Sequence, residues 1–185
     1  MKSPDSILEF WFQEAGPSHW FKSTDAFDAR VRREFESTAT EVAGTISRRV
    51  PHPWEGSADT ALALIITLDQ FPRNMYRATR AAFAWDSLAL GAARRMTEAN
   101  LDLKVDQAMR SFIYMPFMHS ETLSDQDLCV SLCDGRLDSQ STLHHAKEHR
   151  KLIKRFGRFP HRNIVLGRPS SAEETRFLAN NGYAP

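Results

Sequence analysis

Two strings of the sequence place arginine and asparagine directly after a Phe-Pro step. They are LDQFPRN at residues 68–74 and RFGRFPHRN at residues 155–163. A guanidinium group binds a carboxylate or a phosphate through two parallel hydrogen bonds. The two strings therefore predict residues that recognise an anion.

Asp69 is the most informative residue of the first string. A proline is expected to end the preceding helix, which would place Asp69 near the negative end of that helix's dipole. A carboxylate there needs a cationic partner, and Arg73, Arg158 or Arg162 would supply one. The structural alternative is a clamp between Asp69 and an arginine that ties two helix ends together.

His119 and Glu121 follow the apolar run at residues 112–118. A histidine and an acid that emerge from buried sequence could perform general acid–base chemistry. The same pair could equally complete a buried polar network. These two residues are the candidate catalytic groups.

The string HAKEH at residues 145–149 matches the HxxEH pattern of inverted zinc peptidases. Such a site requires a third ligand on a later helix, and Glu173 and Glu174 are the acids available. A short match is weak evidence for a metal. We predict no metal and no other cofactor, with His149 packed in the interior and His145 in solvent.

The charge balance limits the partners of the protein. The 185 residues include 24 Lys and Arg and 23 Asp and Glu, so the formal net charge is +1. This balance gives no general attraction to nucleic acid or to an anionic membrane. Basic residues gather between Lys147 and Arg168, which favours a small anionic molecule or a peptide terminus instead.

The sequence also predicts the compartment and the state of the cysteines. No apolar stretch at the start resembles a secretion signal, and the longest apolar run, residues 61–68, is too short to cross a bilayer. We therefore expect a cytoplasmic protein. Cys129 and Cys133 lie four residues apart in a predicted helix, which suits two buried free thiols.

Helical periodicity and capping residues recur along the chain, and no stretch alternates with a period of two. The apolar run at 61–68 predicts a central helix surrounded by others. Pro116 predicts a kink or a break, and Ser171 with Glu174 predicts a capping box. The seven or eight expected helices include 27–42 behind a cap at Ser23 or Thr24, 57–68, 80–96, 102–114, 124–133, 141–156 and one that begins at Ser171. With no Ser/Gly-rich linker, residues 1–185 are expected to form a single all-α domain.

Several strings together resemble one bacterial family. They are WF at 11–12 and 20–21, FD at 27–28, LDQFPRN, AFAWD at 82–86, YMP to HSE at 114–121, DQ at 125–126 and residues 149–168. The chain thus resembles the bacterial domain-of-unknown-function family nine-twenty-four. The resemblance implies an all-α fold like the tetratricopeptide-repeat superhelix, although no 34-residue repeat is visible. It implies no reaction.

The leading hypothesis is a binding module with an Arg/His-rich pocket for a small anionic ligand or a peptide terminus. The rival is a metal-independent hydrolase or transferase that acts on a phosphorylated or carboxylated metabolite, with His119 as acid or base. A third hypothesis, an interaction scaffold, predicts an exposed apolar groove. The oligomeric state stays open. The pocket would gather Asp69, Arg73, Asn74, His119, Glu121, His149, Arg158, His161, Arg162 and Asn163.

Overall fold

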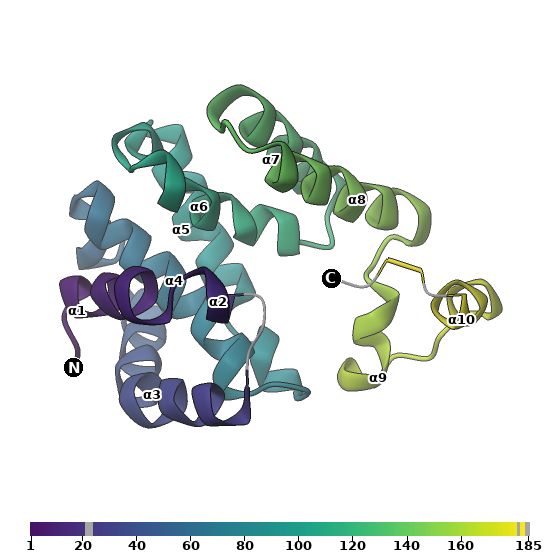
Figure 1. Cartoon of the computed structure of the whole chain (residues 1–185), viewed down its shortest axis with the longest axis horizontal. Coiled ribbons are helices and arrows are strands. Elements are labelled where there is room, and N and C mark those ends of the chain that lie inside the picture. Colours follow the sequence, from purple (N-terminus) through teal and green to yellow (C-terminus); the bar gives the residue numbers. More distant parts are fainter. Residues whose placement is uncertain (21–23, 181, 184–185) are drawn as a thin grey trace. The chain divides into compact units, whose positions relative to one another are not determined.

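The computed structural model is all-α (Figure 1). The structure describes residues 1–20, 24–180 and 182–183, and these residues contain no strand. The chain divides into two compact units, Met1–Pro116 (unit 1) and Phe117–Pro185 (unit 2). The single domain and the repeat-like arrangement stay predictions.

Unit 1 is built around one buried helix. Its α-helices are α1 (Pro4–Glu9), α2 (Pro17–Trp20), α3 (Asp25–Arg48), α4 (Ala58–Met75), α5 (Asp86–Glu98) and most of α6 (Gln107–His119). Shorter turns are η1 (Phe10–Ala15), η2 (Pro53–Gly56), η3 (Arg80–Phe83) and η4 (Leu101–Lys104). Helix α4 packs against α1, α3 and α5, and every residue from Ala61 to Pro72 is buried. The predicted central helix is confirmed.

Helix α4 begins as predicted, but it does not end at the predicted residue. Ser57 accepts a hydrogen bond from the backbone of Thr60 and caps the helix as expected. Pro72, however, lies inside α4, which continues to Met75. A proline in the helical region removes one hydrogen bond, and the complete burial of the preceding turns outweighs that loss. Thr24 caps α3, and Ser23 lies outside the described residues.

Unit 2 contains the end of α6 and the elements α7 (Leu123–Arg136), α8 (Gln140–Phe156), η5 (Pro160–Arg162), α9 (Asn163–Leu166) and α10 (Ala172–Ala179). Helices α7 and α8 pack along each other, and η5 contacts α9 and α10. Helix α8 ends at Gly157, whose φ of 68° favours glycine. The second string therefore ends its helix at a glycine, and Pro160 begins the η5 turn instead.

Two expected helix boundaries in the second half of the chain are wrong. Helix α6 continues through Pro116 to His119 without the expected break, and its apolar face supplies buried contacts on both sides of the proline. Helix α7 begins at Leu123, after Thr122, whose side chain makes no capping hydrogen bond, so Ser124 lies inside the helix. By contrast, Ser171 and Glu174 form the predicted capping box at α10.

Several predicted helices of unit 1 are divided or shifted. The segment expected to be helical from residue 80 forms η3 and then α5, and the segment from residue 102 forms η4 before α6. Ten α-helices occur in the described residues rather than seven or eight. The excess comes from one-turn or two-turn helices that have too few residues to show a hydrophobic period.

Both cysteines are buried free thiols, as predicted. No helix in the described part of the chain is long and apolar enough to cross a membrane.

Candidate functional site

The two Phe-Pro strings lie in different units. Asp69, Arg73 and Asn74 belong to α4 of unit 1. The other predicted residues lie in unit 2: His119, Glu121, His149, Arg158, His161, Arg162 and Asn163.

In unit 1, Asp69 and Arg73 form a buried ion pair within α4. Because α4 continues to Met75, Asp69 lies inside the helix rather than at its end. Its carboxylate is 3.2 Å from Nη1 of Arg73, and the side-chain amide of Gln70 donates a hydrogen bond to its other oxygen. Arg73 also donates two hydrogen bonds to Asp86, at 3.0 and 3.2 Å. Arg73, one of the three candidate partners of Asp69, thus joins α4 to the start of α5.

Asn74 extends this network to α3. Its amide donates a hydrogen bond of 2.8 Å to Asp28, and Arg77 forms an ion pair with the same carboxylate. Burial alone would lower the pKa of Arg73, but Asp69 and Asp86 raise the pKa above its ordinary value. Acids of the protein itself therefore neutralise the arginines of the first string, as in the predicted structural clamp.

In unit 2, Glu121 is held by the second string. Both carboxylate oxygens accept hydrogen bonds from Arg168, at 2.6 and 3.0 Å, and one also accepts the backbone N–H of Phe159 at 2.9 Å. Burial would raise the pKa of Glu121, but the hydrogen bonds from Arg168 and Phe159 lower it below its usual range. Arg168 further donates to the side chain of Asn163 at 3.0 Å. Glu121 thus fixes the turn that carries His161 and Arg162.

Two imidazoles and a guanidinium lie around the ring of Phe159, and a third imidazole lies beside one of the two. The rings of His149 and His161 lie 5.5 and 5.6 Å from the Phe159 ring, and the guanidinium of Arg162 lies 4.5 Å from its centre. Arg162 also donates to the backbone carbonyl of His119 at 3.1 Å, and the ring of His119 is 6.5 Å from that of His149. We call His119, His149, His161 and Arg162 the imidazole–arginine cluster.

The environment of the cluster keeps two of its imidazoles neutral. Burial, with smaller effects from His119 and Arg162, lowers the pKa of His149 to about 3. Burial and the charge of Arg162 lower the pKa of His161 to about 4. Nδ1 of His149 lies 2.8 Å from the carbonyl of His145, so this nitrogen carries the ring proton. Nδ1 of His161 is buried and has no hydrogen-bond partner among the described residues.

Arg158 belongs to a separate contact of unit 2. It donates hydrogen bonds of 2.6 and 2.7 Å to the two carboxylate oxygens of the buried Glu174. This pairing is the main reason why the pKa of Glu174 falls to about 2. Arg158 therefore anchors α10 and is not part of the cluster.

The two histidines of the HAKEH string lie in the environments that the sequence predicts. His149 is buried, whereas His145 is exposed and lies 2.8 Å from the hydroxyl of Tyr183. Within the described ranges, no group of three or more His, Cys, Asp or Glu side chains is arranged to hold a metal ion.

Several residues that complete these networks were not predicted as site residues. Asp28 and Asp86 receive the arginines and asparagine of unit 1, and Phe159 is the centre of the cluster. The sequence signal for Asp28 and Asp86 lies in the FD and AFAWD strings, which contain these two aspartates and contribute to the family resemblance. A pocket of about 510 Å³ in unit 2 was also missed, and it is lined by Arg155, Glu173, Arg176, Phe177, Asn180 and Gly182.

The comparisons with known proteins agree with this fold. The chain matches the family described as "Bacterial protein of unknown function (DUF924)" over residues 7–182. It is also similar to the solved structure of the protein of unknown function ATU0120 from Agrobacterium tumefaciens, with 37% identity and a TM-score of 0.87. That match covers 96% of this chain and 97% of the other. No curated protein matches the chain. The chain belongs to the DUF924 family of bacterial proteins.

Proposed function

We propose that the protein binds a small oxyanion, the phosphate or carboxylate of a metabolite or a peptide terminus, at the imidazole–arginine cluster. One observation carries the proposal. Glu121, a carboxylate that acts electrostatically on this cluster, already accepts two hydrogen bonds from Arg168. The cluster therefore brings together a guanidinium and imidazoles that can become positive, while the nearby acid is already paired with Arg168.

The state of His161 supports an external partner. A buried ring nitrogen without a hydrogen-bond partner costs about 1–3 kcal/mol, and a ligand oxygen would remove that cost. An anion beside His149 and His161 would also raise their depressed pKa values, because an opposite charge favours the protonated form. Binding is therefore coupled to proton uptake and strengthens as the pH falls.

The hydrogen bonds to Glu121 favour this binding function over the alternative, a hydrolase or transferase. Catalysis by His119 with Glu121 would require a carboxylate that can accept or donate a proton. Glu121 instead receives three hydrogen bonds that stabilise its ionised form. Its role in this proposal is to position the turn of residues 159–163.

The proposal also includes the cellular compartment of the protein and the partners that it lacks. We place the protein in the cytoplasm and expect no nucleic-acid partner, because the net charge of +1 provides no general attraction to a polyanion.

Isothermal titration calorimetry with sulfate tests the proposal, because sulfate remains a dianion throughout the useful pH range. We expect saturable binding by the wild type that is stronger at pH 6 than at pH 8. Replacing Arg162 with Gln should weaken binding about tenfold or more through the loss of a charged hydrogen bond. His161→Gln provides a second variant in case Arg162→Gln disturbs the fold, which circular dichroism would reveal.

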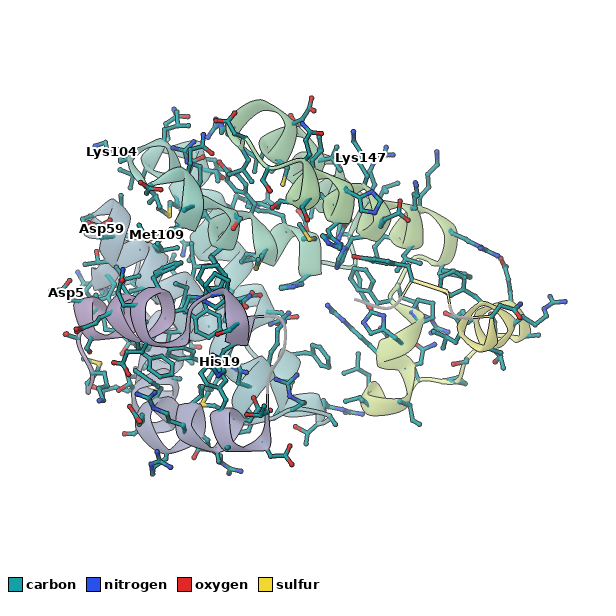
Figure 2. All side chains as sticks on the ribbon, in the orientation of Figure 1. Asp5, His19, Asp59, Lys104, Met109 and Lys147 are labelled. Carbon is teal, nitrogen blue, oxygen red and sulfur yellow. The ribbon has the colours of Figure 1, made fainter. Side chains whose placement is uncertain are left out.

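Two variants on α8 are matched controls. Lys147 projects from α8 to the surface (Figure 2), and His144 is exposed on the same helix. Lys147→Gln and His144→Gln should bind sulfate as the wild type does. Equal affinities in all five proteins, or no saturable binding at either pH, would contradict the proposal.

A further inference from the structure

The residues that line a pocket between α8 and α10 are not those of the imidazole–arginine cluster, although Phe177 packs in the same hydrophobic core as Phe159. The pocket's volume of about 510 Å³ lies within the range of small-molecule sites in proteins. Five of its lining residues come from α10 and the residues that follow it, and Arg155 comes from the last turn of α8. None of them belongs to the predicted site.

The apolar part of the pocket is aromatic. The ring of Phe177 packs against Phe156 at a centroid distance of 5.1 Å. The guanidinium of Arg155 lies 4.7 Å from the Phe156 ring and 5.4 Å from the Phe177 ring. A planar ligand ring could extend this arrangement, because aromatic rings pair with one another and guanidinium groups stack on them.

Gly182 completes this surface through its lack of a side chain. A Cβ atom at this position would lie 2.5 Å from the ring of Phe177, closer than any real contact. The backbone therefore approaches the ring directly, as only glycine permits without movement of its neighbours. Any larger residue would displace the ring that lines the pocket.

The charged residues around the Phe177 ring favour a ligand with a negative charge. Arg155 pairs with Glu173, and both side chains are about half exposed. Within residues 1–20, 24–180 and 182–183, Arg176 has no ion-pair partner. Two arginines and one glutamate leave a net charge of +1 in the lining, which one anionic group on the ligand would balance.

We propose that this pocket binds a flat aromatic molecule that carries a single carboxylate. The ligand ring lies against Phe177, and its carboxylate pairs with Arg176. The side-chain amide of Asn180 offers a donor and an acceptor to other polar groups of the ligand. This proposal does not rest on the oxyanion proposal, because the two sets of residues do not overlap.

Titration of ¹⁵N-labelled protein with benzoate tests this proposal, with benzamide and acetate as matched probes. Benzamide keeps the ring without the charge, and acetate keeps the charge without the ring. We expect saturable shifts of the Asn180 and Gly182 amides with benzoate, and binding about fivefold weaker or more for each of the other two probes.

The variants Arg176→Gln and Gly182→Ala complete the test. Arg176→Gln should weaken benzoate binding about fivefold while its binding of benzamide stays unchanged. Gly182→Ala should weaken both ring-containing probes. Lys147→Gln, a charge removal elsewhere in unit 2, should leave all three titrations unchanged.

Three results would overturn the proposal. The first is the absence of saturable binding of benzoate to the wild type. The second is equal affinity for benzoate and benzamide, or no effect of Arg176→Gln. The third is a set of shifts centred on Phe159 and His161, which would assign benzoate to the imidazole–arginine cluster instead.

Discussion

The two Phe-Pro strings contain similar residues, but Arg73 of the first and Arg162 of the second lie in different electrostatic settings. In unit 1, Arg73 is shared by two carboxylates and Asn74 binds a third. In unit 2, Arg162 donates to a backbone carbonyl, lies beside two neutral imidazoles and interacts electrostatically with Glu121, which Arg168 also holds. An arginine whose charge is matched by the protein's own acids stabilises the fold. An arginine placed among histidines is suited to an external anion.

This difference predicts the largest effect at Asp69. Replacing this fully buried carboxylate with Ala removes one of the two acids that pair with Arg73 and leaves Asp86 as the other. We therefore expect a loss of about 3–5 kcal/mol in the free energy of unfolding. All four tryptophans lie in unit 1, so urea unfolding followed by tryptophan fluorescence reports this unit. Asp59→Asn, an exposed change on the same helix (Figure 2), should cost less than about 1 kcal/mol. Equal effects of the two changes would contradict a clamp role.

The corresponding change in unit 2 is Glu121→Gln. It removes the charge that holds Arg168 and weakens the bond from the backbone of Phe159. We expect a loss of about 2 kcal/mol, smaller than at Asp69 because Glu121 and Arg168 are partly exposed. Hydrogen–deuterium exchange should increase in residues 157–168 and stay unchanged in α4. Unchanged exchange in both segments would show that Glu121 does not hold this turn.

The buried His149 makes unit 2 sensitive to acid. Its pKa is about 3 in the folded state and about 6.5 in the unfolded chain, so between these values only the unfolded chain takes up the proton. Stability is therefore complete above about pH 6.5 and decreases as the pH falls, by up to about 2 kcal/mol between pH 6.5 and 5.

The measurement is urea unfolding by circular dichroism at several pH values. His149→Gln should reduce the slope of stability against pH, whereas His144→Gln should not. Sulfate should oppose the destabilisation by acid, because an anion at the cluster stabilises the protonated imidazoles. The same slope in the wild type and in His149→Gln would assign the acid sensitivity to other groups.

The smallest effect is expected at the start of α10. The Ser171 hydroxyl accepts a hydrogen bond from the backbone N–H of Glu174, and the Glu174 carboxylate accepts one from the backbone N–H of Ser171. Ser171→Ala should cost about 1 kcal/mol. Because Arg158 holds the carboxylate of Glu174 independently, α10 should stay folded, with faster amide exchange in its first turn. Complete loss of protection in α10 would mean that the cap contributes more than this pairing.

The sequence predicts the buried elements of this fold better than their ends. The apolar run at 61–68 and the cap at Ser57 identify α4 because burial and capping are local properties of the chain. Pro72 and Pro116 mislead because tertiary packing decides whether a helix tolerates a proline. The site follows the same rule. Arg73 is one of the three arginines that the sequence offers as a partner of Asp69, whereas Asp86 becomes the second partner of Arg73 only through the packing of α5 on α4.

The pocket of unit 2 shows the same limit. Arg155, Arg176 and Gly182 share no motif and lie up to 27 residues apart in the sequence. Their proximity depends on the packing of the C-terminal residues around Phe177, which no local pattern specifies.

The central claim is that the second string binds an oxyanion and the first does not. The most direct test is a sulfate titration followed by the backbone amide and histidine ring resonances of the whole chain at pH 6. We expect saturable shifts of His119, His149, His161 and the backbone of residues 159–163, with residues 69–74 unchanged. Shifts centred on residues 69–74, or no saturable shift in either string, would contradict this claim.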